Sequence, residues 1–340
     1  MALFNFLTQE LAIDLGTANT LIIYKDKVVV DEPSIIAINR STKEVIAIGK
    51  QAMMMHGKVH DDIKTIRPLK DGVIADFTAA EHMIRGMIRM INPGKRFFSP
   101  SLKMVICIPS GITEVEKRAV RDSAERAGGK EVYLIHEPMA AAIGIGIDVA
   151  EPMGNMVIDI GGGTTEIAVI ALSGIVCDES IRVAGDEFTL DILDYMRRQH
   201  NLLIGERTAE TIKIEVGAAL PDLDNPPPDY EVNGRDLVTG LPKQVVVTYS
   251  EIALALDKSI SKIEEAILKA LEITPPELSA DIYQTGLYLT GGGALLRGLD
   301  KRVSRRTKLP VHVADDPLKA VVRGTGIALK NIHRFKFLMP

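Results

Sequence analysis

The sequence has 340 residues and a formal net charge of −5, with 46% hydrophobic and 25% charged residues. This length predicts two lobes rather than one core, and the composition is that of an ordinary globular protein. The acidic balance, the absence of Trp and an aromatic content of only 4% argue against a nucleic-acid partner, because nucleic-acid binding uses basic patches and stacking platforms.

The sequence also predicts where the protein is found in the cell. No run approaches the length of a membrane span, and the N-terminus lacks the basic flank and long apolar region of a secretory signal. Cys107 and Cys177 each lie in an apolar, strand-like run, which predicts free buried thiols in a reducing compartment. We therefore expect a cytoplasmic protein.

The first motif is an acidic turn near the start of the chain. The apolar run Leu11–Ile13 leads into the segment Asp14–Thr20 (DLGTANT), and the β-favouring run Leu21–Tyr24 follows. This order predicts a strand, a tight turn and a second strand. Glycine lets backbone N–H groups approach an anion closely, and consecutive N–H groups form an anion-binding nest. Because an adjacent carboxylate would repel phosphate unless a divalent cation lay between them, the turn predicts a phosphate–Mg²⁺ clamp.

Strands and helices then alternate, apart from Val28–Ile66, which reads as a small inserted subdomain. Such alternation predicts a mostly parallel sheet flanked by helices, with ligands at the carboxyl ends of the strands. The expected elements are a buried strand at Leu102–Pro109, an amphipathic helix at Thr113–Ala127, a strand at Val132–Ile135 and a helix at Met139–Ile147 after Glu137-Pro138.

The acidic turn is repeated in the second half of the chain. Met156–Ile158 precede the segment Asp159–Glu166 (DIGGGTTE), and Ile167–Ile170 follow it. Either copy alone could be a plain glycine-rich hairpin. Two copies in matching contexts predict the two facing halves of one phosphate-binding site.

A second irregular segment, Arg182–Val247, reads as another inserted subdomain. A long helix and a break at Pro275-Pro276 lead from it to a final strand. The expected elements are helices at Phe188–His200, Thr208–Ala218 and Ser250–Leu271, and strands at Tyr230–Val232, Gln244–Thr248 and Leu287–Thr290.

A third glycine cluster, Gly291-Gly292-Gly293-Ala294, follows the last of these strands. It opens toward a helix, a geometry in which backbone can pack flat against a ring or a phosphate. It is not a Walker A loop, because no Lys-Ser/Thr pair follows, and it lacks the spacing of the dinucleotide fingerprint. An ordinary loop is the alternative.

Five segments, in order, resemble the phosphate 1, connect 1, phosphate 2, adenosine and connect 2 motifs of the actin, sugar-kinase and heat-shock chaperone ATPase superfamily. They are Asp14–Thr20, Ile108–Gly144, Asp159–Val169, Leu289–Leu299 and Gly324–Leu329. Longer stretches, among them IAIDLGTANT, EPMAAAIG and DIGGGTTE, resemble the MreB family of bacterial actins over nearly the whole chain. The resemblance implies an α/β, actin-like fold of two related lobes around a nucleotide cleft.

The resemblance also implies domain boundaries. Domain I would comprise residues 1–145, completed by 317–340, with the small domain IB inserted at about 31–67. Domain II would comprise residues 146–316, with IIB inserted at about 182–247.

Site residues follow by the same resemblance, with ATP or ADP and Mg²⁺ as cofactors. Glu137 would orient the attacking water, Asp159 and Thr164 would complete the catalytic set, and Asp14 and Asp159 would hold Mg²⁺ through its waters. The expected nucleotide-binding residues are Asp14, Gly16, Thr17, Ala18, Asn19, Gly161, Gly162, Gly163, Thr164, Thr165, Glu210, Lys213, Gly291, Gly292, Gly293 and Ala294.

Two of these assignments have plain alternatives. Glu137 could be a helix N-terminal carboxylate favoured by the helix dipole. Glu210 and Lys213 lie three residues apart on one helical face, so they could reach one ligand together or form a solvated ion pair.

The resemblance further implies pairing of antiparallel protofilaments through the helix that carries Val115. Three segments are membrane candidates: the apolar N-terminus with Leu3 and Phe4, the loop that combines Lys95 and Arg96 with Phe97 and Phe98, and the tail His333–Met339, which has a similar mixture. Phe97 and Phe98 could instead pack under the following strand.

The resemblance thus implies a slow ATPase that forms filaments on the inner face of the plasma membrane and organises cell-wall synthesis and rod shape with wall-elongation proteins. Two alternatives share the same ATPase core. A small-molecule kinase needs an acceptor pocket and a catalytic Asp, and a chaperone-type ATPase needs a peptide-binding domain; the sequence offers no candidate for either.

Overall fold

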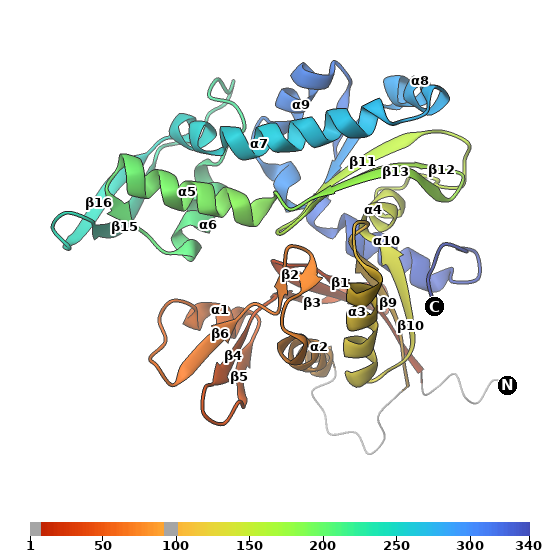
Figure 1. Ribbon diagram of the computed structural model, residues 1–340, viewed down its shortest axis with the longest axis horizontal. Helices are drawn as coiled ribbons and strands as arrows, with labels where there is room; N and C mark the ends of the chain where they lie inside the picture. The colour runs from red at the N-terminus through yellow and green to blue at the C-terminus, as the bar shows by residue number, and fades with distance from the viewer. Residues whose placement is uncertain (1–7, 92–100) are drawn as a thin grey trace.

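The computed structural model describes residues 8–91 and 101–340, and two five-stranded sheets form its centre (Figure 1). The first sheet has the order β10-β9-β1-β2-β3. Strand β1 pairs antiparallel with β2 and parallel with β9, and β9 pairs parallel with β10. The strands are β1 (Thr8–Leu15), β2 (Asn19–Tyr24), β3 (Lys27–Pro33), β9 (Ser101–Ile108) and β10 (Gly129–His136).

The second sheet repeats this arrangement in the order β13-β12-β11-β17-β18. Strand β11 pairs antiparallel with β12 and parallel with β17, as β1 does with β2 and β9. The strands are β11 (Asn155–Ile160), β12 (Thr165–Ala171), β13 (Gly174–Ile181), β17 (Leu287–Thr290) and β18 (Val311–Val313). Strand β18 was not expected, since the sequence predicted β17 to be the last strand. We call the halves built on the two sheets lobe I and lobe II.

Each sheet is covered on its outer face by helices. In lobe I, α2 (Phe77–Ile91) and α3 (Glu114–Arg126) pack against the sheet. Helix α3 begins where the sequence predicts, because Thr113 and Glu116 form a capping box; α2 was not predicted. The helices of lobe II are α5 (Gly185–Gln199), α6 (Glu206–Val216), α7 (Tyr249–Glu272), α8 (Pro276–Thr285) and α9 (Leu299–Thr307).

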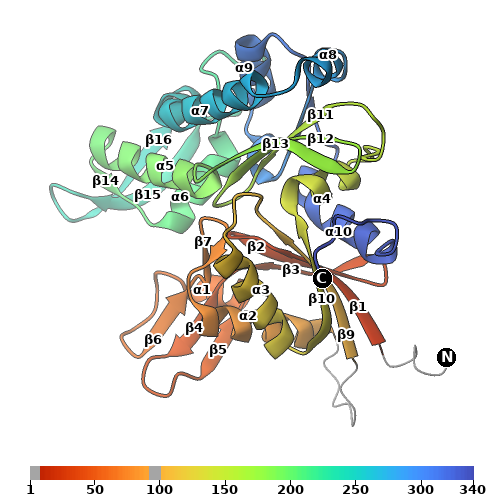
Figure 2. The same ribbon diagram turned by 45° about the vertical axis from the view of Figure 1, so that its right-hand side comes forward.

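The inner faces of both sheets meet two helices, α4 (Glu137–Gly144) and α10 (Ala320–Lys330), which lie between the lobes in Figures 1 and 2. One continuous core joins them: Ala12 and Val105 of the first sheet and Val157 and Ala168 of the second belong to it together with both helices. The helices cross at glycines. A methyl group on Gly324 would lie 1.7 Å from the carbonyl oxygen of Ala140, so the two backbones touch.

Smaller sheets extend from each lobe. In lobe I, β4 (Ile36–Asn39), β5 (Val45–Ile48) and β6 (Ile63–Ile66) form one sheet beside α1 (Lys50–Met55), and β7 (Leu69–Lys70) and β8 (Val73–Ile74) form a hairpin. In lobe II, β14 (Leu202–Leu203), β15 (Tyr230–Asp236) and β16 (Pro242–Val247) form the third small sheet.

The tail after α10 packs on lobe I instead of projecting as a free membrane anchor. Met339 exchanges two backbone hydrogen bonds with Leu134 at the edge strand β10, Leu338 is buried, and the rings of Phe335 and Phe337 lie 5.1 Å apart. Among the described residues, no helix is both long and apolar enough to cross a bilayer. The other membrane candidates, Leu3, Phe4, Phe97 and Phe98, lie outside the described residues.

Candidate functional site

The two acidic turns face each other across the junction of the lobes. The first joins β1 to β2, and the second joins β11 to β12. A methyl group on Gly162 would lie 2.7 Å from Cβ of Ala18, and one on Gly163 would lie 2.7 Å from Oγ1 of Thr17. Only glycine allows this approach, so the small residues of the motif bring the two turns into contact.

Each turn is held by its own lobe. In the first, Ser34 Oγ donates a hydrogen bond to the carbonyl of Gly16 at 2.6 Å, and Thr17 Oγ1 accepts one from the backbone N–H of Gly72 at 3.0 Å. In the second, the carbonyls of Gly161 and Gly162 accept hydrogen bonds from the first two N–H groups of α5, at 3.1 and 2.7 Å. The contact with Gly72, in the turn between β7 and β8, was not predicted from the sequence.

Four carboxylates gather beside these turns: Asp14 at the end of β1, Asp159 in β11, Glu166 in β12 and Glu137 at the first position of α4. Asp14 accepts a hydrogen bond from Cys107 Sγ at 3.1 Å, and Asp159 accepts one from Thr290 Oγ1 at 2.8 Å. None of the four forms an ion pair with a cationic side chain in the described part of the chain. The neighbours Cys107, Thr290 and Glu166 were not assigned from the sequence.

Burial disfavours the charged form of Asp14, Glu137 and Asp159, and it is the largest cause of the pKa shift of each. Burial raises the pKa of Asp14 to about 6 and that of Asp159 to about 7. The pKa of Glu137 lies well above its usual value, first through burial and then through the nearby charges of Glu166, Asp159 and Asp14. The cluster is therefore an uncompensated acidic site, which a cation would stabilise.

The oxygen ligands of this carboxylate cluster suit Mg²⁺ that is bound together with water and phosphate. Within residues 8–91 and 101–340, no group of three or more His, Cys, Asp or Glu side chains is arranged to chelate a metal. Mg²⁺ dehydrates reluctantly and usually takes one or two carboxylates, its remaining ligands being waters and substrate phosphates. Asp14 and Asp159 fit that pattern.

Glu210 and Lys213 lie on α6 beside the start of α5. Their side chains form the ion pair that the sequence offered as an alternative, at 2.6 Å, and the pair is part of a larger network. Lys213 Nζ donates to the carbonyl of Gly185 at 2.8 Å, and Thr189 Oγ1 donates to Glu210 at 2.7 Å. Because the backbone N–H of Gly185 also donates a hydrogen bond to Gly161, this network adjoins the second acidic turn.

The third glycine cluster packs against the second turn. Gly291 has a left-handed backbone (φ +77°), and a methyl group there would lie 2.4 Å from the carbonyl oxygen of Ile160 and 2.7 Å from Oδ1 of Asp159. Residues 292–295 continue as a short 3₁₀ helix. The cluster thus joins the other predicted site residues. Val115 does not, since it lies on the exposed face of α3 with 79% of its surface accessible.

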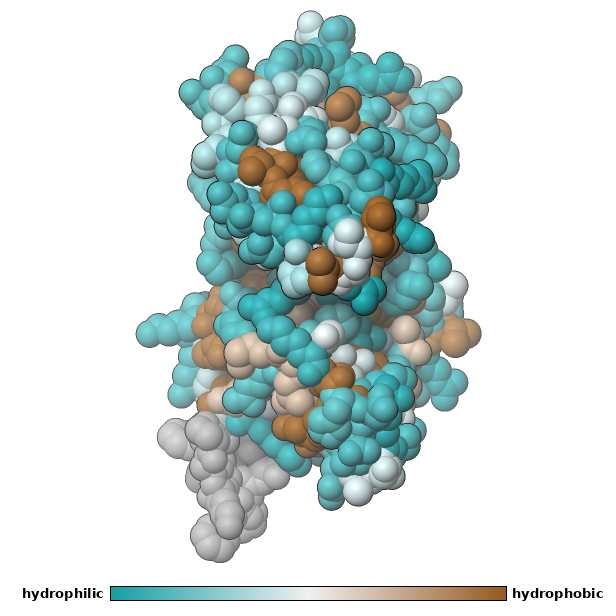
Figure 3. Space-filling model, turned by 90° about the vertical axis from the view of Figure 1, so that its left-hand side faces the viewer, coloured by the Kyte–Doolittle hydropathy of each residue, from teal (hydrophilic) through white to brown (hydrophobic). Residues whose placement is uncertain are grey.

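A cavity of about 400 Å³ opens beside Glu210 and is lined by both lobes. Arg67 of lobe I crosses it, with Nη1 3.4 Å from Asp186 Oδ1 and Nη2 3.9 Å from Glu206 Oε2. His56 Nε2 lies 3.5 Å from the same Glu206 oxygen. This side of the molecule faces the viewer in Figure 3, where a hollow separates the lobes. These bridges join residues more than 100 positions apart, and no local motif indicated them.

Known proteins resemble the chain over almost its whole length. A profile of the family described as MreB/Mbl protein matches residues 8–337. The cell shape-determining protein Mbl of Bacillus cereus is 49% identical over 327 residues, covering 96% of this chain and 97% of that protein. The cell shape-determining protein MreB of Escherichia coli is 48% identical over 330 residues, covering 96% and 94%.

Solved structures share the architecture. MreB5 of Spiroplasma citri bound to AMPPNP is 39% identical and has a TM-score of 0.90, covering 96% of this chain and 97% of that chain. A structure of the same protein bound to ADP has the same score. A MamK double helical filament, 21% identical with a TM-score of 0.79, shares the fold. These likenesses confirm the actin-like α/β fold predicted from the sequence.

Proposed function

The chain belongs to the MreB/Mbl family, and from this premise we propose that it is an ATP-hydrolysing, filament-forming bacterial actin that organises cell-wall synthesis and rod shape. One observation carries the ATPase part: two glycine-rich turns from different lobes meet beside four carboxylates that have no cationic partner in the described structure. A Mg-nucleotide supplies both the anion for the turns and the cation for the carboxylates. The Spiroplasma citri structures with AMPPNP and ADP support ATP and ADP as ligands.

Different groups of site residues bind the phosphates, the metal ion and the adenosine moiety. Backbone N–H groups and hydroxyls of both turns bind the phosphates: Gly16, Thr17, Ala18 and Asn19 from lobe I, and Gly161, Gly162, Gly163, Thr164 and Thr165 from lobe II. Asp14 and Asp159 would hold Mg²⁺ through its waters, and the ion would supply positive charge opposite the phosphates. Glu210, Lys213 and the segment Gly291–Ala294 bind the adenosine moiety.

Glu137 orients the attacking water and accepts its proton. It lies at the carboxyl end of β10, where ligands of such sheets bind, and its raised pKa makes the carboxylate a better base than an exposed one. Thr164, buried in the opposite turn, positions the same water from lobe II.

At the scale of the whole protein, we propose domain I at 1–145 and 317–340, with IB at 31–67, and domain II at 146–316, with IIB at 182–247. Nucleotide binding to both turns draws the lobes together, and the closed form favours subunit contacts. Val115 pairs antiparallel protofilaments. Leu3, Phe4, Phe97 and Phe98 attach the filament to the inner face of the plasma membrane, where wall-elongation proteins bind it.

The catalytic assignment is tested by Glu137→Ala. Because a water-orienting carboxylate acts mainly in the transition state, Mg-ATP affinity should stay within about twofold while single-turnover hydrolysis falls by roughly 10²–10⁴. The exposed Glu151→Ala is the matched control. Hydrolysis within about threefold of the parent would reject Glu137 as the catalytic residue.

The kinase and chaperone alternatives are tested separately. Electron microscopy of the protein with Mg-ATP should show filaments, and phosphate release should occur without any phosphorylated small product. A phosphorylated acceptor would favour a kinase, and the lack of any polymer would contradict the cytoskeletal assignment.

A further inference from the structure

Glu166 is a fully buried carboxylate that accepts hydrogen bonds from residues of both lobes. Its side chain has no exposed surface. One oxygen, Oε2, accepts hydrogen bonds from the backbone N–H and the hydroxyl of Ser110, at 3.0 and 2.5 Å, and the other, Oε1, accepts one from Ser180 Oγ at 2.7 Å. Ser110 follows β9 of lobe I, whereas Glu166 and Ser180 lie in β12 and β13 of lobe II. The carboxylate therefore fastens the loop after β9 to the other lobe.

This loop also contacts the residue that precedes the proposed catalytic residue. The carbonyl of Pro109, next to Ser110, lies 3.3 Å from His136 Nδ1. A carbonyl can only accept, so Nδ1 carries the proton and donates it. His136 is paired with Ile108 at the end of the sheet and is the residue immediately before Glu137.

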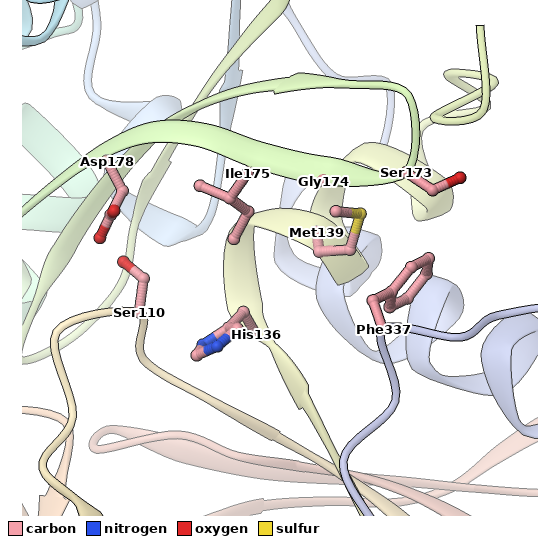
Figure 4. Close-up of a pocket in the computed structure, with 8 residues that line it drawn as sticks. All are labelled: Ser110, His136, Met139, Ser173, Gly174, Ile175, Asp178 and Phe337. Carbon is pink, nitrogen blue, oxygen red and sulfur yellow. The ribbon is translucent and has the colours of Figure 1, made fainter.

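Figure 4 shows Ser110 and His136 in the lining of a cavity of about 210 Å³ between the lobes. Ser110 faces Asp178 on β13, and His136 lies below it where β10 passes into α4. Ser110 and His136 thus form one wall of this cavity and strand β13 forms another. The loop after β9 therefore contacts both lobe II, through Ser110, and the residue before Glu137, through Pro109.

We propose that Glu166 is a positioning residue for hydrolysis: through Ser110, Pro109 and His136 it places Glu137 against the attacking water. This proposal rests on the ATPase function proposed above. It explains why a buried carboxylate with no cationic partner among the described residues is matched by three donors, two from one lobe and one from the other. It also makes the catalytic geometry depend on contact between the lobes, since separating them breaks both bonds to Ser110.

The test removes the inter-lobe hydroxyl with Ser110→Ala. Single-turnover ATP hydrolysis should fall by about tenfold, while the Mg-ATP dissociation constant stays within about twofold. Ser110→Thr, which keeps the hydroxyl, should restore most of the rate. The control is Ser259→Ala, which removes a buried hydroxyl–carboxylate bond of 2.5 Å to Asp191 within lobe II and should leave hydrolysis unchanged. Equal losses in affinity and thermal stability without a specific loss of rate would show a merely structural role.

A double-mutant cycle identifies the residue through which Ser110 acts. If it acts through Glu137, adding Ser110→Ala to Glu137→Ala should change the residual rate by less than about twofold. A full additive loss in that background would overturn the proposal while leaving the ATPase assignment intact. Conversely, normal hydrolysis by Glu137→Ala alone would reject the catalytic role of Glu137 and with it this proposal, whereas the absence of hydrolysis by the parent would reject the proposed ATPase function. If Ser110→Ala fails to fold, Ser180→Ala removes the lobe II donor and should give a smaller loss of rate, with the same lack of additivity.

Discussion

Asp159 is 5% exposed, accepts one hydrogen bond from Thr290 and forms no ion pair within the described chain. Burial raises its pKa from 3.8 to about 7. Between these values the folded protein binds more protons at this site than the unfolded chain does, so stability falls as the pH rises through that window. Without a bound cation, the acidic site destabilises the fold most above neutral pH.

Asp159→Asn should therefore stabilise the protein without ligand. The amide oxygen can still accept from Thr290, and the charge is gone. The free energy of unfolding of Asp159→Asn, minus that of the parent, should increase by about 2–3 kcal/mol from pH 5 to pH 8. Urea unfolding at both values measures it, with the exposed Asp148→Asn as control. The same variant should bind Mg-ATP more weakly by calorimetry, and unchanged affinity would exclude Asp159 from the cation site.

Among single residues of the candidate site, sequence motifs indicated those that lie in continuous segments of the chain. Asp14, Asp159, Glu137 and the glycines stand where the motifs placed them, because strand ends and tight turns are local features. Glu166 lay in a predicted motif but received no role, since its donor Ser110 is 56 positions away. Arg67 was missed because its partner Asp186 is 119 positions away. Side-chain partners across the cleft are set by the tertiary fold, which no local pattern encodes.

Among the helices, α3 presents its charged face and Val115 to solvent while Val120 and Ala124 are buried against lobe I. If two copies of α3 meet, Val115→Glu would bury an unpaired carboxylate at a cost of several kcal/mol. Filaments of the variant should be single rather than paired by electron microscopy. Arg118→Glu on the same exposed face tests whether any added negative charge has this effect. Paired filaments of normal width in Val115→Glu would reject this interface.

The crossing of α4 and α10 allows a test with a control in the same helix. Gly324→Ala would place a methyl group 1.7 Å from a carbonyl of α4, whereas a methyl group on Gly326 finds its nearest neighbour at 3.3 Å, the end of the Ile23 side chain. Gly324→Ala should destabilise the protein by at least about 2 kcal/mol. Gly326→Ala should be neutral or stabilise it by up to about 1 kcal/mol. Thermal unfolding measures the stability of both variants, and an equal change in stability would contradict the close crossing of α4 and α10.

The sequence predicted elements well where hydrophobic periodicity and caps agreed, as in α3 and α7, both of which begin with a capping box. Among the elements that it missed are α2, α8, α10 and β18. Strand β18 has three residues, all at least partly exposed, so its pairing to β17 depends on the sheet and not on its own pattern. Helix α2 follows the short β7–β8 hairpin and is capped by Asp76, whose Oδ1 accepts a hydrogen bond from the backbone N–H of Ala79 at 2.9 Å, but its first turn carries no acidic residue.

On the scale of the whole filament, membrane attachment should depend on polymerisation. Lys95, Arg96, Phe97 and Phe98 can place two rings at the headgroup boundary and two cations near anionic lipid. Each cation contributes about 1 kcal/mol, so one monomer binds weakly, and a filament multiplies the contact. Binding to anionic vesicles should rise on assembly and fall with salt.

The double change Phe97→Ser with Phe98→Ser should release filaments from vesicles without blocking assembly, as measured by co-sedimentation. Val238→Ser with Leu241→Ser, an equally apolar pair exposed at the β15–β16 turn, is the control. Sedimentation of the Phe variant with vesicles would assign the attachment to Leu3 and Phe4 instead.

The shared core around α4 and α10 has a consequence for how the protein is made. Lobe I needs α10 to cover its inner face, yet residue 320 leaves the ribosome long after β10 and α4 do. At a synthesis rate of about 5–20 residues per second, the finished first sheet waits on the order of ten seconds or more with one apolar face uncovered. During translation the nascent chain should therefore bind holding chaperones through this face and release them only when α10 has been synthesised.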